Sequence, residues 1–335
     1  MSPLGAVYTH SDQPLVHQAL LYGSDEEFLT TAGAFLSEGL AAGEIATAVT
    51  TPHNLRLLRA FVGENDNVHY VEAGSWYHTP GATLGAYLRV LRSHDDRLGR
   101  HRVIGEPVWA GRDDLELLEW TRYESVLNTT FCGEHAWILC PYDTRTLPRG
   151  VVSSAMRTHP EVVGGYDTWL SLSYRDPAEF AAECDGRPLE PAVDPKGIVV
   201  TRAGLHSVRE FVATVAGEYG LAEPRRSWLV AAVNELATNV VAHGGGHGEV
   251  RLWRDGGALV CEVVDPAGKL TLPHPGQLCP PKGSLSGYGL WVARQLCDLM
   301  QVRVDNGRSI VRVRMALDAS GPPAPADRLG LLDVD

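Results

Sequence analysis

Two α/β domains in one chain are the fold that this sequence predicts: a largely parallel α/β domain followed by an α+β domain. Residues 15 to 143 alternate short apolar strands with amphipathic helices. Such alternation predicts a parallel sheet covered by helices, because parallel strands need long crossover connections. After residue 196, a strand and two helices precede strands joined by short turns, and this order predicts a sheet of antiparallel hairpins packed against helices.

The elements of the first domain follow from apolar runs and the residues that interrupt them. We expect strands at 18–22, 45–50, 68–71, 102–105 and 136–140, and helices at 25–40, 52–61, 82–91 and 113–127. Ser24, followed by three acidic residues, is a capping box for the first helix, and Pro52 begins the second.

Polar and aromatic residues gather where two of these strands end. Ligands of parallel sheets bind beyond the carboxyl ends of the strands. We therefore predict a sensory pocket built from Glu106, Trp109, Glu124, Asn128, Tyr142 and Asp143. The alternative stays open: the aromatic rings pack in the core, while the polar groups cap helices or bridge strands.

The turn after the first strand stands where RecA-like ATPases carry a phosphate-binding loop with a lysine. Here three acids occupy it, Asp25, Glu26 and Glu27, and residues 1 to 195 contain no lysine. Because these acids would repel phosphate, we expect that this domain is not a second ATPase. With the opening His17-Gln18-Ala19-Leu20-Leu21-Tyr22 and the polar strand ends, residues 15–174 resemble the MEDS domain, the DcmR-type sensory domain. The resemblance implies a RecA- or KaiC-like α/β sandwich without a P-loop, which senses a small molecule.

The second domain is organised around the helix at 229–243. Its apolar residues recur at spacings of three and four and form a core stripe. Glu235, Asn239 and His243 stand four apart and share a different face. An amide oxygen is a suitable Mg²⁺ ligand, and a carboxylate can accept a proton. The row alone is also consistent with the solvated side of an amphipathic helix.

The fifty residues after this helix favour a nucleotide site. We expect strands at 250–253 and 258–264, an acid, Asp265, at the end of the second, and then a structureless stretch from 266 to 286. Gly287 and Gly289 open a helix at 290–300, and strands at 301–304 and 309–315 follow, joined by an Asn306-Gly307 turn. Glycines at a helix start suit phosphate, and the long loop suits a lid over a nucleotide.

These motifs together resemble the GHKL ATPase superfamily and, more closely, the Rsb-type anti-sigma-factor serine kinases. The resemblance covers 198–317 and implies a Bergerat-type α/β sandwich that binds ATP and Mg²⁺. It implies that Glu235 is the catalytic base and Asn239 the Mg²⁺ ligand. It places the nucleotide on Asn239, His243, Asp265, Gly268, Gly287, Gly289, Leu290 and Ser309. His243 equally suits a helix C-terminal cap, which we favour. One departure is Gly268, since the family's adenine-box glycine stands one place earlier.

The resemblance implies a function and partners. The function is a regulatory serine/threonine kinase and anti-sigma factor in a bacterial partner-switching pathway. Its partners are an anti-anti-sigma (STAS) protein, which it phosphorylates, and a sigma factor. A small-molecule ligand on the N-terminal domain would adjust this activity, and homodimers are usual in these kinases. The alternative is an inactive ATP-binding module that sequesters a partner. A sensor histidine kinase needs a dimerising two-helix segment with a phosphorylated histidine before its ATPase domain. This function is disfavoured, because His206 lies only 29 residues before Glu235 and the domain's first strand and helix fill that stretch.

Composition sets limits on other functions. The net charge of −12 argues against direct nucleic-acid binding. The chain has no signal peptide and no apolar run long enough for a membrane span, so we expect a cytoplasmic protein. The six cysteines form no C-x2-C pair. Cys132, His135 and Cys140 suggest zinc, but a fourth ligand is not evident, and a buried strand thiol is the stronger interpretation of Cys140.

The predicted domain boundaries follow from composition. We expect a MEDS-like domain at 1–176, a linker at 177–195 that begins with a helical patch, an ATP-binding kinase domain at 196–318 and a flexible tail at 319–335.

Overall fold

The computed structural model describes residues 14–93, 99–165, 167–268, 270, 274–280 and 287–318. The chain divides into two compact units. The first comprises Met1–Trp76, Val90–Ala110 and Leu127–Tyr174. The second comprises Tyr77–Arg89, Gly111–Val126 and Arg175–Asp335. Two helices, α5 (Pro80–Arg92) and α6 (Asp114–Thr130), run across this division.

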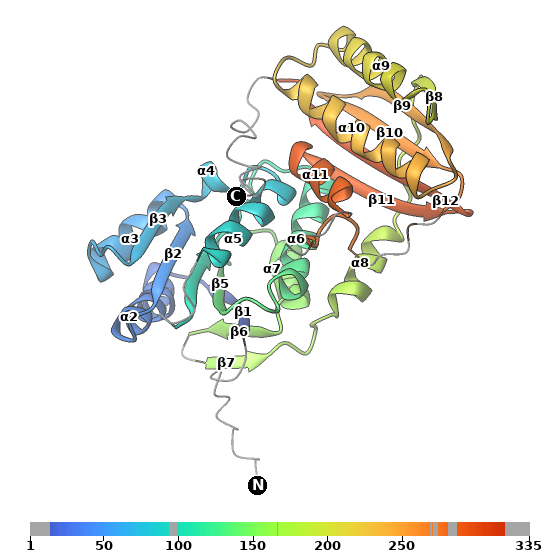
Figure 1. The fold of residues 1–335 in the computed structure, drawn as a ribbon. Coiled ribbons are helices and arrows are strands. Elements are labelled where there is room, and N and C mark those ends of the chain that lie inside the picture. Colours follow the sequence, from blue (N-terminus) through green and yellow to red (C-terminus); the bar gives the residue numbers. More distant parts are fainter. Residues whose placement is uncertain are drawn as a thin grey trace. The chain divides into compact units, whose positions relative to one another are not determined.

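The sheet of the first unit has seven strands in the order β3-β2-β4-β5-β1-β6-β7 (Figure 1). Their bounds are β1 Leu15–Tyr22, β2 Ile45–Thr50, β3 Val68–Glu72, β4 His101–Gly105, β5 Ala136–Asp143, β6 Glu161–Gly164 and β7 Asp167–Leu170. Every neighbouring pair is parallel except β6 and β7. The predicted largely parallel sheet is therefore confirmed, and only β6 and β7 were not expected from the sequence.

Helices connect the strands of the first unit. They are α1 (Asp25–Phe28), the π-helix η2 (Leu29–Gly33), α2 (Ala34–Ala41), α3 (Pro52–Val62), α4 (Ala73–Trp76) and α7 (Arg149–Thr158). The Ser24 hydroxyl accepts a hydrogen bond from the Glu27 amide at 3.1 Å, and Thr51 caps α3 in the same way. The predicted first helix is thus one helical run, interrupted by a π-helical turn.

The two faces of this sheet carry different residues. One face packs Leu20, Ile104 and Leu139 against the helices through Phe28 and Leu36, which form an apolar core. Side chains alternate between faces along a strand. His17 on β1 and Cys140 on β5 therefore point to the opposite face, where α7 contacts β1. This places two chemically active side chains on adjacent strands.

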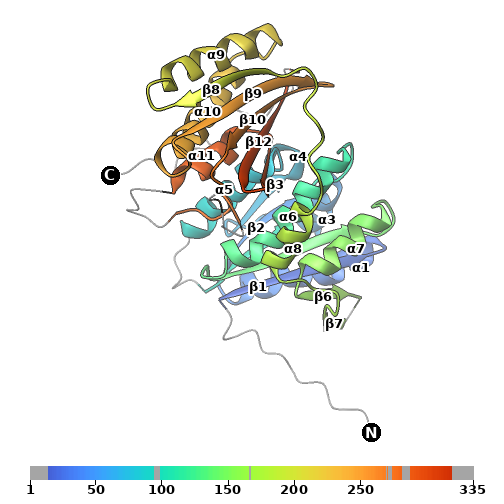
Figure 2. The same cartoon turned by 90° about the vertical axis from the view of Figure 1, so that its right-hand side faces the viewer.

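The second unit is an antiparallel sheet with helices on one face. Its strands run in the order β11-β12-β10-β9-β8. Figure 2 labels β8, β9, β10 and β12 of this sheet. The bounds are β8 Lys196–Thr201, β9 His247–Asp255, β10 Ala258–Asp265, β11 Leu299–Asp305 and β12 Arg308–Ala316. Helices α9 (Leu205–Glu218), α10 (Arg225–Ala242) and α11 (Tyr288–Leu296) cover this face and bury a large apolar core. The predicted α/β sandwich is confirmed.

One predicted element is wrong in its bounds. The sequence predicts a helix to Met300, but α11 ends at Leu296. Met300 instead lies in β11 and pairs with Val313 of β12. The apolar run passes from helix to strand without Gly or Pro, so nothing in the sequence signals the change.

The predicted linker contains a helix, α8 (Pro177–Asp185). Phe180 and Cys184 of this helix are buried. Its last residue, Asp185, accepts hydrogen bonds from Arg122 and Arg303, each at 2.6 Å. The helix is therefore a packed part of the second unit. The predicted tail at 319–335 lies outside the described residues, as do residues 269, 271–273 and 281–286 of the predicted lid. No helix in the described part of the chain is long and apolar enough to cross a membrane.

Candidate nucleotide site and polar centres of the first unit

A cavity of about 310 Å³ lies in the second unit, between α10, the end of β10 and the start of α11. Apolar side chains form much of its wall, from Leu236, Val240, Val263, Leu290 and Val311. Seven of the residues predicted to contact nucleotide line it: Asn239, His243, Asp265, Gly287, Gly289, Leu290 and Ser309. These residues come from four separate segments of the chain, which the fold brings together.

Asp265 is held rigidly at the end of β10. Its Oδ1 atom accepts hydrogen bonds from the Gly245 amide at 3.0 Å and the Ala267 amide at 2.8 Å. Its other oxygen, Oδ2, lies beside Gly244, where a Cβ atom would stand only 2.0 Å away. The glycine after α10 is thus needed for the carboxylate to occupy this position. The residue Asp265 is 8% exposed, and it lines the cavity.

Ser309 and Gly268 lie close to this carboxylate. Ser309 pairs directly with Asp265 across β10 and β12, and its hydroxyl accepts a hydrogen bond from the Leu270 amide at 3.2 Å. Gly268 does not line the cavity but has a φ of +57°, and a Cβ there would stand 2.2 Å from the Gly307 carbonyl oxygen. The late glycine of the adenine box therefore permits a tight turn that packs against the β11–β12 turn.

The glycines of the second motif bring α11 against α10. Gly287 has a φ of +94°, a left-handed conformation that favours glycine, and directly precedes α11. A Cβ on Gly289 would stand 3.0 Å from Nδ2 of Asn239 and 3.2 Å from Oε2 of Glu235. The start of this helix thus lies directly beside the Glu235–Asn239 pair.

Glu235 and His243 occupy the two ends of the predicted row. Glu235 is half-buried and does not line the cavity, but it borders a groove of about 470 Å³ on another side of α10. Arg209, Arg226 and Val292 also line this groove. His243 is the exposed C-cap of α10, and its amide donates to the Asn239 carbonyl at 2.9 Å. It caps the helix and also lines the cavity.

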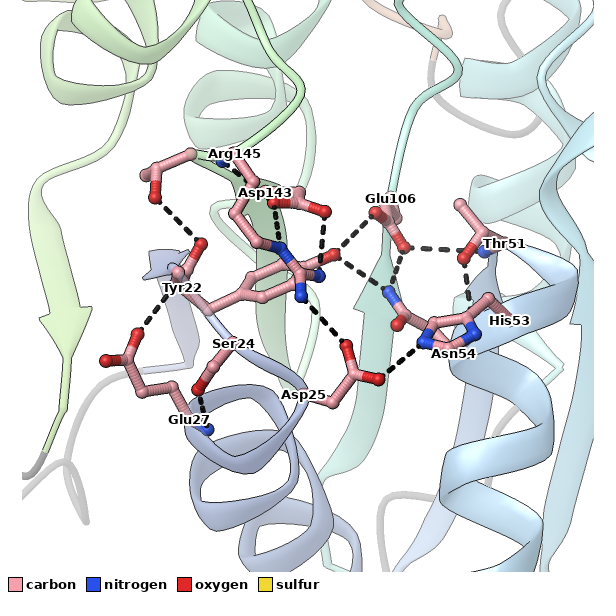
Figure 3. Close-up of polar contacts among 12 residues, drawn as sticks. Tyr22, Ser24, Asp25, Glu27, Thr51, His53, Asn54, Glu106, Asp143 and Arg145 are labelled. Atoms are coloured by element: carbon pink, nitrogen blue, oxygen red, sulfur yellow. Dashed lines mark hydrogen bonds and ion pairs between the residues drawn. The ribbon is translucent and has the colours of Figure 1, made fainter.

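In the first unit, Glu106 is the centre of a buried hydrogen-bond network (Figure 3). Its carboxylate accepts hydrogen bonds from the Tyr22 hydroxyl at 3.2 Å, the Asn54 amide at 2.9 Å and the Thr50 hydroxyl. Burial raises the pKa of Glu106 and also that of Tyr22. The network joins the ends of β1, β2 and β4.

Ion pairs occupy the turn after β1 (Figure 3). Arg145 lies 2.9 Å from Asp143 and 3.1 Å from Asp25, and His53 lies 2.8 Å from Asp25. The Gly23 amide, which in a phosphate-binding loop would face a ligand, donates instead to Glu27 at 2.6 Å. Carboxylates and their partners thus occupy the space around this turn.

Comparison with protein-family models assigns both units. Residues 16–160 match MEDS, the MEthanogen/methylotroph, DcmR Sensory domain, and residues 199–315 match the histidine kinase-like ATPase domain. The chain joins a MEDS domain to a histidine kinase-like ATPase domain. The resemblances to the MEDS domain and to the GHKL ATPase superfamily are thereby confirmed.

Comparisons with individual proteins add less. No curated protein matches this chain. A crystal structure of the RsbU and RsbW domains of Rv1364c from Mycobacterium tuberculosis is 17% identical, covering 40% of this chain and 36% of that one, with a TM-score of 0.29.

The ATPase family implies ATP, usually with Mg²⁺, and the residues around the cavity fit such a ligand. The apolar wall suits a base, and the Asp265 carboxylate can accept a hydrogen bond from an adenine amino group. The Asn239 amide is a hard oxygen ligand of the kind that Mg²⁺ prefers. The glycine-rich start of α11 provides backbone N–H groups and a favourable dipole for phosphate.

Arg294 is a residue of the ATPase domain that the sequence analysis did not identify. It is buried on α11 and donates to the Met300 carbonyl and the Pro275 carbonyl, both at 3.1 Å. These hydrogen bonds hold segment 274–280 against α11. The segment contributes His274, Gly276 and Leu278 to the cavity wall. An arginine in an apolar helix is a signal that could have been used.

The residues of the predicted sensory pocket have different contacts in the MEDS domain. Trp109 and Tyr142 face each other with ring centroids 6.0 Å apart, and Asp143 pairs with Arg145. Asn128 instead contacts His17 at 3.0 Å. Glu124 is buried on α6. Tyr142 also lies beside His159, with ring centroids 5.7 Å apart, so Trp109, Asn128 and Tyr142 all lie near the His17–His159 pair. A single pocket shared by all six residues stays a prediction.

The sequence analysis also missed a group of three buried side chains in the MEDS domain. His17 and Cys140 lie 3.4 Å apart between Nε2 and Sγ, and the rings of His17 and His159 have centroids 4.1 Å apart. His17 lies more than 120 positions before both Cys140 and His159 in the sequence. Their proximity depends on the pairing of β1 with β5, which the sequence alone does not specify.

Proposed function

We propose that this protein is a regulatory serine/threonine kinase and anti-sigma factor in a partner-switching pathway. It would phosphorylate an anti-anti-sigma protein of the STAS type, and a ligand of the MEDS domain would modulate this activity. The observation that carries the proposal is the position of Glu235. Its carboxylate lies beside Gly289 at the phosphate-binding end of the cavity and also borders the groove on the other side of α10.

Five of the residues that line the cavity would hold the nucleotide. Asp265 and Ser309 would recognise the base, and Gly287 and Gly289 would let the backbone approach the phosphates. Asn239 would hold Mg²⁺ through its amide oxygen. Bound Mg-ATP supplies the phosphoryl group and the charge neutralisation that transfer requires.

Glu235 would act on the substrate protein. A serine that enters the groove beside Arg209 and Arg226 would reach the Glu235 carboxylate. The carboxylate would accept the hydroxyl proton as the oxygen attacks, which is the role of a general base.

Regulation would act through the affinity of the ATPase domain for its partners. The same surface would hold a sigma factor once the antagonist is phosphorylated. A ligand of the MEDS domain would change these affinities by about 1–3 kcal/mol, or roughly 5- to 150-fold, which is the usual size of such coupling.

The decisive experiment is phosphotransfer from labelled ATP to a STAS protein, with wild type, Glu235→Gln and the matched control Glu210→Gln on exposed α9. We expect transfer by wild type and the control, and a loss of about 100-fold or more in Glu235→Gln with ATP binding retained. ATP binding without any transfer by wild type would favour the alternative, a module that binds ATP and sequesters a partner.

A further inference from the structure

A cluster of metal-ligand side chains lies inside the first unit. His17 of β1, Cys140 of β5 and His159, which follows α7, are at most 3% exposed. Their ligand atoms all lie within 4.8 Å of one another. Imidazoles so deeply buried need polar partners, and the convergence of two of them on a thiol indicates a chemical role.

Hydrogen bonds fix which nitrogen of His17 faces the cluster. The Asn128 amide donates through Nδ2 to the Thr158 carbonyl at 2.8 Å, which sets its orientation. Its Oδ1 atom then accepts from Nδ1–H of His17 at 3.0 Å. Nε2 of His17 therefore carries the lone pair, and this atom points at the Cys140 sulfur, 3.4 Å away.

The same arrangement holds for His159. Its Nδ1 atom lies 2.9 Å from the Ala155 carbonyl oxygen, which can only accept a hydrogen bond. Nδ1 therefore carries the proton, and Nε2 again carries the lone pair. Neutral imidazoles whose other nitrogen donates to an amide or backbone oxygen are the form in which histidine ligates metals.

We propose that His17, Cys140 and His159 form a binding site for a divalent transition-metal ion, with Zn²⁺ as the simplest fit. Zinc–nitrogen and zinc–sulfur bonds of about 2.0–2.3 Å place tetrahedral ligand atoms roughly 3.5 Å apart. The His17–Cys140 separation already has this value. Asn128 is a positioning residue that orients His17.

Three protein ligands leave a coordination position that a small molecule can take, as in zinc sites that bind water or substrate. A cavity of about 280 Å³ borders His17 and Asn128 and has Cys132 in its wall, whereas Cys140 and His159 do not line it. The metal would thus bind a small ligand that coordinates through oxygen, nitrogen or sulfur. This inference is independent of the ATP site.

The test is a Co²⁺ titration of the full chain after removal of metals with a chelator and without nucleotide. Cobalt replaces zinc and gives a near-ultraviolet absorption band only when a thiolate ligates it. We expect one Co²⁺ per chain with this band, displaced by Zn²⁺. Cys140→Ser should abolish the band, and Asn128→Ala should weaken binding about 10- to 100-fold, as loss of an outer-shell partner does.

The matched controls are Cys132→Ser, beside the same cavity, and Cys184→Ser, a buried cysteine elsewhere; both should keep the band. Circular dichroism identifies any variant that fails to fold, and the wild-type titration decides the question without variants. No thiolate band in folded wild type at excess Co²⁺ would overturn the proposal. A band that persists in Cys140→Ser would overturn it as well.

Discussion

The most specific consequence of the site concerns Asp265→Asn. In the structure Oδ1 of Asp265 accepts from the Gly245 and Ala267 amides, while Oδ2 lies beside Gly244. An asparagine can keep the first oxygen and both backbone hydrogen bonds. It replaces the second oxygen with an NH₂ group, which cannot accept a hydrogen bond from an adenine amino group.

The size of the effect follows from that single exchange. A hydrogen bond to a charged group contributes about 1.5–3 kcal/mol net, so the Kd for ATP should rise roughly 10- to 150-fold. Guanine presents a carbonyl oxygen at the same position, to which the new NH₂ can donate. The preference for ATP over GTP should therefore fall further than the affinity for ATP alone.

The assay is competition of ATP and GTP against a fluorescent nucleotide, with Asp255→Asn as control. Asp255 lies in the exposed turn at the other end of the same hairpin and should change nothing. Thermal unfolding of each apoprotein would show that the fold is intact. Unchanged ATP affinity in a folded Asp265→Asn variant would refute the assignment of this carboxylate to the base.

Two further predictions concern a glycine and a buried acid. Gly289→Ala should lower ATP affinity at least about tenfold, because its Cβ would stand 3.0 Å from the Asn239 amide. The control Gly257→Ala, where a Cβ meets nothing within 4 Å, should leave ATP affinity unchanged. Calorimetric titrations that give the two variants equal ATP affinities would contradict this prediction. Burial raises the pKa of Glu106, so the native state holds its proton more tightly than the unfolded state, and the stability contribution of Glu106 falls as pH rises through the window between the two pKa values. Glu106→Gln should lack this loss in melting curves taken between about pH 5 and pH 8, and parallel wild-type and variant curves would count against it.

The ATPase domain was largely predictable because its motifs are local. Glu235 and Asn239 share a helix face by spacing alone, and Asp265 stands where a strand ends. What spacing could not give is the approach of Gly289 to Asn239, which depends on how α11 packs on α10. The bounds of α11 failed for a related reason, since Met300 joins a strand through pairing that arises only in the folded sheet.

The MEDS domain shows the limit of local reasoning more clearly. The alternation of strands and helices predicted its parallel sheet. The polar residues at strand ends, however, pair with partners that no spacing indicates. Glu106 bonds to Tyr22, and Asn128 orients His17, because β1 lies beside β5 and β4 beside β2. The Glu106 network and the surroundings of His17 each combine several strands and helices, so they become visible only once the strand order is known.

The measurement that bears most directly on the proposed function is calorimetric titration of ATP, with and without Mg²⁺. It would use wild type, Asn239→Ala and the control Asn234→Ala, whose side chain on α10 accepts from Arg209 instead. We predict Mg²⁺-dependent binding in wild type and in Asn234→Ala, and loss of the Mg²⁺ dependence in Asn239→Ala. Absence of ATP binding by wild type, or unaltered binding by Asn239→Ala, would contradict the assignment of this cavity to Mg-ATP.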